Sequence, residues 1–346
     1  MVGALFACLL ASCSTAFQNG DSTTAATAPP LVVGISPYQD IAQIVNAKNL
    51  GLEEKYGTRL EYVTMAWDDI LPAVASNGRT VDVGFGSLIE FLCKSKNING
   101  ESDDPVVFFH PAYVFRGGGF ISFNDAVPEL TPENIQDTAL LRRFLTFRFG
   151  LQRNNVSEMI IFSLARRAGI KPSQLRTVDN TINDCLLACE HGSLDASFAG
   201  LTQRTEALKR KGRIVLSMDT VGLADVTGFI CKQSTLNKRR KDLESLVRIW
   251  YDCSNYVVGD LDHHSQATLA YLKANASTQY TLPEFKRALT SEYFPRSLAE
   301  SRREIVSARG KYSLDRISRE TGQYLVEIGA VKTPPLPPEI LPIAVE

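Results

Sequence analysis

Residues 192–201 read GSLDASFAGL, and residues 80–88, TVDVGFGSL, carry nearly the same pattern earlier in the chain. When Asp195 is aligned with Asp82, a phenylalanine three positions later and a leucine six positions later coincide. Each copy follows a helical pattern that ends in a glycine, and each is a short apolar run between an aspartate and small residues. Such runs are typical of buried strands in parallel sheets, whose ligands bind at the strands' carboxyl ends. The repeat therefore predicts two lobes that face one cleft.

The aspartates of this repeat allow two interpretations. Asp82 and Asp195 could contact a ligand, or they could bond backbone amides where each strand begins. We favour the second interpretation, in which both residues are structural.

Length and composition fit a soluble protein of two lobes. The chain has 346 residues, which is too long for one compact core. It is 44% hydrophobic, an ordinary value for a soluble globular protein. Its 37 basic residues nearly balance its 38 acidic ones, so we expect no nucleic-acid partner.

The N-terminus indicates export. Residues 2–11 form an unbroken apolar run that is too short to span a bilayer as a helix. The run ends in Leu-Ala-Ser-Cys and resembles the signal of bacterial lipoproteins, although no Lys or Arg precedes it. We expect residues 1–12 to be a lipoprotein signal peptide, Cys13 to be lipidated, and residues 13–30 to form a flexible tether. The alternative is an ordinary secretory cleavage site that contains a cysteine.

The remaining cysteines do not suggest a disulfide framework or a metal site. Their odd number argues against a dense set of disulfides in an exported protein. Cys185 and Cys189 lie one helical turn apart, but no histidine has ligand spacing to them. We expect buried thiols that pack as small hydrophobic groups, and neither a metal nor a cofactor.

Strand and helix patterns alternate through most of the chain, which predicts an α/β fold. Strands are expected at 31–35, 60–65 and 106–109, and Asp40, Asp68 and Thr202 are expected to cap helices. The triple glycine 117–119 suggests a crossing between lobes, either as a hinge or as a strand-entry turn. From 236 onward the pattern is almost wholly helical and ends in a proline-rich strap. We assign residues 31–114 and 224–346 to lobe 1, and residues 115–223 to lobe 2.

Candidate ligand-binding residues lie in loops at predicted strand ends. They are aromatic, glycine or hydrogen-bonding residues: Ser36, Tyr38, Trp67, Gly86, Ser87, Phe115, Arg116, Gln152, Asn154, Asn155, Asn180, Gly200, Gln203 and Asp225. Tyr38, Trp67 and Phe115 could clamp a planar ring. Helices opened by Ser87, Asn155 and Thr202 would aim amides and positive dipole ends into the cleft.

No catalytic motif is recognisable in the sequence, so we do not expect an enzyme. The order of segments from residue 31 to about 342 instead resembles the substrate-binding proteins of bacterial ABC importers for nitrate, sulfonates, taurine and thiamine precursors. The Pro37-Tyr38 loop, the turn at 48–52, both repeats and the ending at 324–335 carry this resemblance. It implies a two-lobed periplasmic-binding-protein fold of type II. It further implies an ABC permease and its ATPase as partners of a lipid-anchored, extracytoplasmic monomer.

The ligand class stays open between two alternatives. Arg116 with Ser36 and Ser87 would suit a sulfonate, taurine or nitrate-type anion. The three aromatic residues with Asp40 and Asp225 would suit a nitrogen heterocycle such as a thiamine-precursor pyrimidine, which we favour slightly. A pyrimidine-related enzyme and a sensory binding protein of the same fold are further alternatives.

Overall fold

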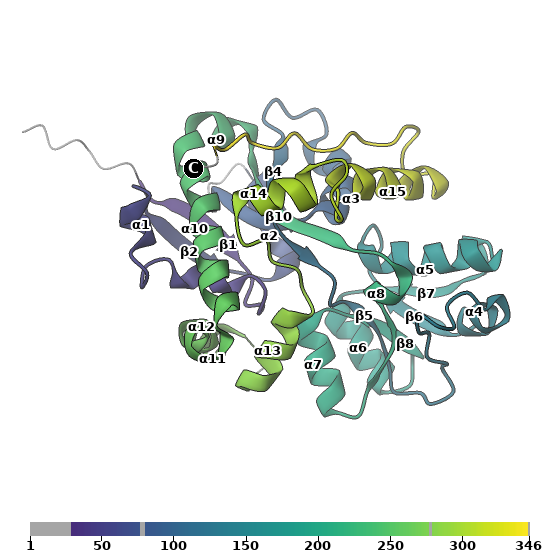
Figure 1. Ribbon diagram of the computed structural model, residues 1–346. Coiled ribbons are helices and arrows are strands. Elements are labelled where there is room, and N and C mark those ends of the chain that lie inside the picture. The colour runs from purple at the N-terminus through teal and green to yellow at the C-terminus, as the bar shows by residue number, and fades with distance from the viewer. Residues whose placement is uncertain (1–28, 77–79, 277–278, 345–346) are drawn as a thin grey trace, which may run out of the picture.

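The computed structural model describes residues 29–76, 80–276 and 279–344, and it contains two five-stranded sheets flanked by helices (Figure 1). The predicted α/β class and two-lobed arrangement are confirmed. The predicted signal peptide, Cys13 and nearly all of the tether lie outside the described residues.

The first sheet belongs to lobe 1 and has the order β2-β1-β3-β10-β4. Its strands are β1 Leu31–Ile35, β2 Leu60–Thr64, β3 Val83–Ser87, β4 Val106–Phe115 and β10 Asp225–Lys232. β10 returns from lobe 2 and runs antiparallel to both of its neighbours, with Thr227 opposite Tyr113.

The second sheet belongs to lobe 2 and has the equivalent order β7-β6-β8-β5-β9. Its strands are β5 Gly119–Ser122, β6 Arg148–Leu151, β7 Arg176–Asp179, β8 Ala196–Ala199 and β9 Arg213–Ser217. The two copies of the sequence repeat become β3 and β8, which hold the same central position beside an antiparallel crossing strand.

The repeat aspartates have the same structural role in each lobe. Asp82 accepts a hydrogen bond of 3.0 Å from the backbone amide of Val32 on β1. Asp195 accepts one of 2.8 Å from the amide of Arg148 on β6, and the guanidinium of Arg148 bonds it as well. The structural interpretation is therefore confirmed, because each aspartate joins its strand to the neighbouring one.

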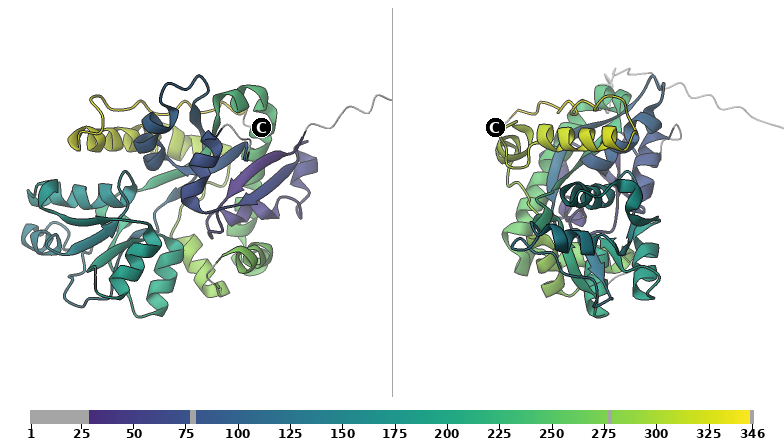
Figure 2. Two further views of the ribbon diagram at one scale, coloured as in Figure 1. Left: turned by 180° about the vertical axis from the view of Figure 1, so that it is seen from behind. Right: turned by 90° about the vertical axis from the view of Figure 1, so that its right-hand side faces the viewer.

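Helices cover both faces of the two sheets (Figure 2). They are α1 Leu52–Lys55, α2 Trp67–Ala75, α3 Leu88–Asn99, α4 Thr138–Phe144, α5 Val156–Ala168, α6 Ile182–Glu190, α7 Leu201–Lys209, α8 Met218–Val221, α9 Gln233–Lys238, α10 Arg240–Gly259, α11 Leu261–His264, α12 Gln266–Asn275, α13 Leu282–Thr290, α14 Leu298–Ser301 and α15 Leu314–Glu327. Short 3-10 helices at Ala42–Asn46 and Pro172–Gln174 and a π-helical turn at Arg302–Val306 complete the set.

The core of lobe 1 forms where α10 lies against the first sheet. Its apolar residues follow helical spacing, and Trp250 is fully buried against Phe85 and Phe229. The indole N–H of Trp250 donates to the carbonyl of Ala112, at 3.0 Å, so its polar group is satisfied inside the core.

Several predicted boundaries were wrong. β4 is one strand of ten residues, because it pairs with β10 along its whole length. Trp67 begins α2 and does not lie in a loop, and Asp68 occupies the first turn, where the helix dipole favours a carboxylate. Asp40 precedes a 3-10 helix without capping it, and Gly200, not Thr202, is the N-cap of α7.

The first crossing between lobes runs through Gly117 and Gly118, which join β4 to β5. Glu292, at the end of the α13 region, accepts the backbone amides of Arg116 and Gly117 at 2.5 and 2.8 Å. A Cβ on Gly117 would lie 2.1 Å from Glu292 Oε1. Glycine is therefore needed here because the neighbouring carboxylate lies so close.

The C-terminal segment joins distant parts of the chain. α15 packs against α3 of lobe 1, while its Tyr324 and Glu327 bond Glu158 and Arg166 on α5 of lobe 2. The proline-rich tail then runs along the surface, with the amide of Leu341 donating to the carbonyl of Phe109 at 2.8 Å. The predicted strap is confirmed.

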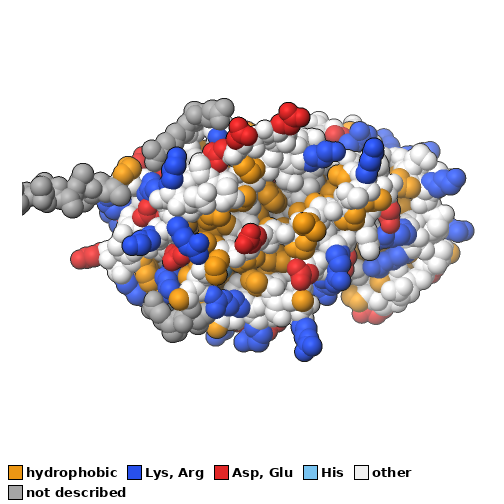
Figure 3. Space-filling model, turned by 90° about the horizontal axis from the view of Figure 1, so that it is seen from above, with side chains coloured by type: hydrophobic (Ala, Val, Ile, Leu, Met, Phe, Trp, Pro, Cys, Tyr) orange, Lys and Arg blue, Asp and Glu red, His pale blue; other side chains and the backbone are white. Residues whose placement is uncertain are grey.

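The outer surface mixes charges of both signs. On the face drawn in Figure 3, basic and acidic side chains surround a central area of hydrophobic side chains. Within the described ranges, no helix is long and apolar enough to cross a membrane.

Candidate functional site

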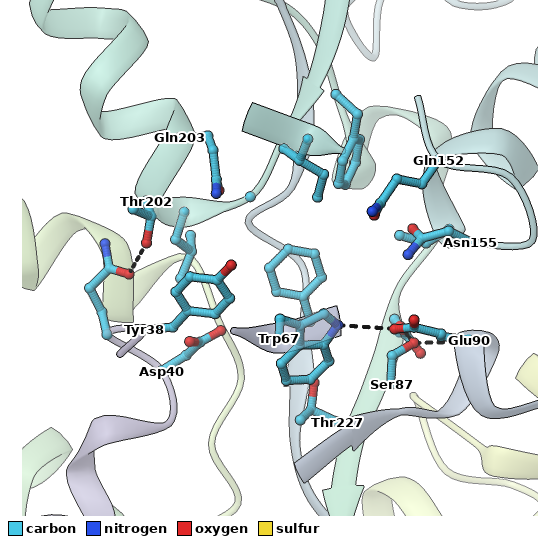
Figure 4. A pocket seen from close by; sticks show the side chains of 18 of the residues that line it. Tyr38, Asp40, Trp67, Ser87, Glu90, Gln152, Asn155, Thr202, Gln203 and Thr227 are labelled. Carbon is cyan, nitrogen blue, oxygen red and sulfur yellow. Dashed lines mark hydrogen bonds between the residues drawn. The ribbon is translucent and has the colours of Figure 1, made fainter. Parts of the chain in front are cut away.

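A cavity lies between the two lobes, at the carboxyl ends of the central strands, with a volume of about 90 Å³. Lobe 1 contributes Tyr38, Gln39, Asp40, Trp67, Ser87, Glu90, Tyr113, Phe115, Asp225 and Thr227 to its lining. Lobe 2 contributes Gln152, Asn155, Val156, Ile182, Phe198, Gly200, Leu201, Thr202 and Gln203. Figure 4 shows the polar residues of lobe 2 facing Tyr38, Trp67 and Ser87 across this space.

Most of the residues proposed from sequence meet at this cavity. Those that line it are Tyr38, Trp67, Ser87, Phe115, Gln152, Asn155, Gly200, Gln203 and Asp225. They come from loops far apart in the chain, and the shared topology of the two sheets brings those loops together.

Two of the predicted residues in lobe 1 lie outside the lining. Ser36 is buried and donates to the carbonyl of Met65 at 3.1 Å, so its hydroxyl serves the backbone. Gly86 lies inside β3, where an added Cβ would lie 3.2 Å from two carbon atoms of Ile230.

Three further predicted residues also lie outside the lining. Arg116 forms a two-pronged ion pair with Asp219, at 3.0 and 2.7 Å. Asn154 has a positive φ of 55°, and its backbone amide donates a hydrogen bond to Glu158 Oε2. Asn180 is exposed and lies just before Thr181, the N-cap of α6. The arginine on which the anion alternative depended is thus already paired.

Aromatic rings form one wall of the cavity. The rings of Tyr38 and Trp67 are stacked, with centroids 6.4 Å apart and planes inclined by 30°. The indole N–H of Trp67 donates to Glu90 Oε2 at 3.0 Å (Figure 4), which fixes the orientation of the ring. Phe115 and Phe198 line the cavity as well. Such a wall suits a flat ligand.

Asp225 lies at the start of β10 and faces the first turn of α3. Its carboxylate accepts hydrogen bonds from the hydroxyl of Ser87 and, at 3.2 Å, from the amide of Ile89. Ser87 in turn accepts from the amide of Glu90, as an N-cap. Burial raises the pKa of Asp225 to about 7.

Asp40 supplies a second carboxylate from the loop after β1. Its Oδ2 accepts a hydrogen bond of 2.7 Å from the hydroxyl of Tyr113. Its Oδ1 is buried and has no hydrogen-bond partner among the described residues. Burial raises the pKa of Asp40 to about 6. An acceptor without a donor lies at this edge of the cavity, where a ligand N–H could satisfy it.

The N-termini of α5 and α7 lie on the lobe 2 side of the cavity. Asn155 caps α5, as predicted, and accepts from the amide of Ser157. The N-cap of α7 is Gly200, which has no side chain to satisfy the amides of the first turn. Gly200, Leu201 and Thr202 all line the cavity, so the uncapped amides of this first turn are suited to a ligand acceptor.

Two hydrogen bonds join the lobes at the edges of the cavity. Thr202 donates to Gln39 Oε1 at 3.0 Å, and the amide nitrogen of Gln152 donates to Asp68 at 3.2 Å. Because each bond joins a residue of lobe 2 to a residue of lobe 1, movement of the lobes would make or break it.

Sequence reasoning missed several lining residues, and some of them left a signal. Tyr113 lies two residues before Phe115 and Thr227 two residues after Asp225, so strand alternation places each on the same face as its predicted neighbour. Glu90 lies one helical turn after the cap Ser87 and resembles a capping-box residue. Val156, Ile182, Phe198 and Leu201 look like ordinary core residues in the sequence.

No family model and no curated protein sequence matches the chain. Solved structures do match. The periplasmic aliphatic sulphonate binding protein SsuA from Escherichia coli is 14% identical, with a TM-score of 0.62 over 88% of this chain and 95% of that chain. A Candida albicans gene product, CA3427, described as having the generic periplasmic binding protein fold, is 12% identical, with a TM-score of 0.63 over 88% of this chain and 91% of that chain.

The same fold also carries an enzyme. The desulfurization enzyme DSZB is 12% identical, with a TM-score of 0.54 over 88% of this chain and 94% of that chain. At these identities the comparisons establish the fold. The chain is a two-lobed protein of the periplasmic-binding-protein fold, as the resemblance implied.

Proposed function

We propose that the protein is an extracytoplasmic solute-binding protein that captures a small molecule between its lobes and delivers it to an ABC permease with an ATPase partner. The observation that carries the proposal is the inter-lobe cavity, which both sheets line with the residues at their strand ends. Binding proteins such as SsuA share the fold over most of both chains.

The proposed ligand is a small nitrogen heterocycle of the aminopyrimidine kind. Stacked Tyr38 and Trp67 offer a surface for a flat ring. Asp40 and Asp225 offer acceptors for ring N–H and amino groups, while the amides of α7 offer donors for ring nitrogens. A compound with hydrogen-bond donors and acceptors along one edge could bond both the carboxylates and the amides of α7.

A sulfonate or nitrate ligand remains the second candidate, because structures named for sulfonate and nitrate binding share the fold. Their ligands would need a basic or donor-rich site. Arg116 is paired with Asp219 outside the cavity, which weakens this candidate.

We propose binding without chemical turnover, although one protein of this fold is an enzyme. Cys93 is a half-buried thiol beside the site region, and burial raises its pKa to about 12, which disfavours the nucleophilic thiolate. The other described cysteines, 185, 189, 231 and 253, are buried free thiols, as expected.

We further propose that the mature protein is a monomer held at a bacterial membrane through lipidated Cys13, with residues 13–30 as a tether. The proposed lobe boundaries are those given above, except that Phe115 ends β4 of lobe 1. The support for the anchor is the apolar run before Leu-Ala-Ser-Cys. A sensory role would use the same cavity and differ in its partner.

Thermal-shift measurements on the purified protein test the binding function. The panel sets aminopyrimidines and thiamine against taurine, alkanesulfonates and nitrate. A ligand at about a hundred times its dissociation constant should stabilise the fold by roughly 2.7 kcal/mol, or several degrees. We expect the aminopyrimidines to raise the melting temperature and to be recovered unchanged by chromatography.

The variant Trp67→Ala should lose this shift, because the ring wall is gone. Trp250 is the other tryptophan and does not line the cavity, so Trp250→Phe serves as the control and should retain the shift. A shift with taurine or nitrate alone would move the function to the anion candidate. Conversion of the ligand into a product would show an enzyme.

A further inference from the structure

The charges that line the cavity are all of one sign. Three carboxylates reach it, from Asp40, Glu90 and Asp225. Among the residues that the structure describes, no Arg, Lys or His lines it. A buried site with this balance disfavours an anion, because each acid repels it at short range and low effective dielectric.

One of the three carboxylates already has a cation. Lys94 lies one helical turn after Glu90 on α3 and forms an ion pair with its Oε1, and Trp67 bonds the other oxygen. Glu90 is therefore satisfied by the protein and serves mainly to orient Trp67.

Asp40 and Asp225 have only neutral partners. Asp225 is bonded by a serine hydroxyl and a backbone amide, and Asp40 by the Tyr113 hydroxyl. Arg204 on α7 is a half-buried cation, and it bonds the carbonyl of Gly117 and the hydroxyl of Ser291. Glu292, just after α13, is another acid, and its charge interacts unfavourably with that of Asp40.

The helix N-termini that could hold an anion are mostly occupied. The amides of Ile89 and Glu90 on α3 are taken by Asp225 and Ser87. On α5, Asn155 takes the amide of Ser157. Only the first turn of α7, among these three helices, has no side-chain cap. Its neutral donors suit a ring nitrogen or a carbonyl as well as an anion.

We infer that the cavity selects a flat ring compound that carries a positive charge, such as an amidinium or a protonated aminoheterocycle, with its N–H groups donating to Asp40 and Asp225. The inference rests on the proposed binding function and narrows its ligand class. The charged edge gains two charge-assisted hydrogen bonds, and the faces of Tyr38 and Trp67 favour a cationic ring over a neutral one.

Three probes with one ring and different charge test the inference. Benzamidine is a cation at pH 8, benzamide is neutral, and benzenesulfonate is an anion. Isothermal titration calorimetry on the purified protein measures the affinity for each. We expect benzamidine to bind more tightly than benzamide by on the order of tenfold or more, and benzenesulfonate not to bind.

Variants connect the charge preference to the two acids. Asp40→Asn and Asp225→Asn keep the shape of the side chain and remove its charge. Each should weaken benzamidine on the order of tenfold or more and leave benzamide nearly unchanged. Asp262→Asn is the matched control, because Asp262 pairs with Lys286 outside the cavity, and it should behave as the unmodified protein.

The outcomes separate the inference from the binding function. Equal binding of benzamidine and benzamide, or preference for benzenesulfonate, would overturn the charge inference and leave a ring-binding protein. A protein that binds none of the three would overturn the ring-binding function together with the inference. The comparison of probes on the unmodified protein gives this answer even if a variant does not fold.

Discussion

Ser87 donates a hydrogen bond to the carboxylate of Asp225, and this contact joins the first turn of α3 to the returning strand β10. The amide of Ile89 donates to the same carboxylate at 3.2 Å. An acid of the protein therefore occupies the position that an anionic ligand would take at this helix. The contact connects the N-cap of α3 to the first residue of β10 and places a carboxylate at the cavity.

Replacing Asp225 should change how stability depends on pH. Its pKa rises from the ordinary value of 3.8 to about 7, so the folded state holds the proton more tightly than the unfolded state does. This carboxyl therefore lowers the free energy of unfolding as pH rises from about 4 to about 7. Asp225→Asn removes this titration. The difference in melting temperature, variant minus unmodified protein, should therefore increase by a few degrees from pH 5 to pH 8.

Melting curves of both proteins at the two pH values measure this difference. Asp262→Asn again serves as the control, since Asp262 is exposed and pairs with Lys286. A difference that stays constant or falls with pH would contradict the assigned role of the buried carboxyl.

Binding of a permanent cation should release protons near pH 6. At that pH the raised pKa values of Asp40, about 6, and Asp225, about 7, leave both groups partly protonated in the free protein. A cation stabilises their ionised forms, so its affinity should increase from pH 5 to pH 8. Calorimetry in two buffers of different ionisation enthalpy counts the released protons. Uptake of protons, or affinity that falls with pH, would show that other groups contact the ligand.

The crossing segment should not tolerate a side chain at Gly117. An alanine Cβ would lie 2.1 Å from Glu292 Oε1 and 2.3 Å from Leu201 Cδ2. We expect Gly117→Ala to destabilise the protein by roughly 1–3 kcal/mol, as overpacked substitutions do. Gly259→Ala is the matched control, because nothing lies within 4 Å of its added Cβ at the end of α10.

The control should be neutral or stabilising by up to about 1 kcal/mol, since alanine favours the helix. Urea denaturation of both variants measures the two effects. Equal stability of the two variants would mean that the crossing segment is loosely packed.

Cys13→Ser should release the protein from membranes. A lipidated cysteine would hold the chain in the membrane fraction of expressing bacteria, and the serine variant should appear in the soluble fraction. Cys8 lies within the predicted signal, so Cys8→Ser is the control and should leave the distribution unchanged. Equal fractionation of all three proteins would indicate ordinary secretory cleavage.

Local patterns were sufficient to predict the fold. The aspartate-led repeats became the central strands β3 and β8, and their aspartates bond the neighbouring strands in the same way. The long amphipathic pattern after residue 236 became α9 and α10, divided at Arg239. These features depend on period and on short-range chemistry, which a single sequence contains.

The site was harder to predict because it depends on pairing across the chain. Loops named from sequence do meet at the cavity, but the partners of their side chains could not be foreseen. Arg116 is engaged by Asp219, and Ser36 by the carbonyl of Met65. Glu90 lies within one helical turn of a predicted residue, yet its bond to Trp67 depends on how α2 and α3 are placed. Which charges stay unpaired is decided by tertiary contacts.

Trp67 fluorescence tests the central claim most directly, because the chain has two tryptophans and only this one lines the cavity. The probe is the hydroxymethyl aminopyrimidine precursor of thiamine, titrated into the unmodified protein and into Trp67→Phe, which retains Trp250. We predict a saturable change in emission of the unmodified protein and none in the variant. An equal change in both proteins would place the ligand outside the cavity, and no change together with no calorimetric heat would contradict binding of this ring class.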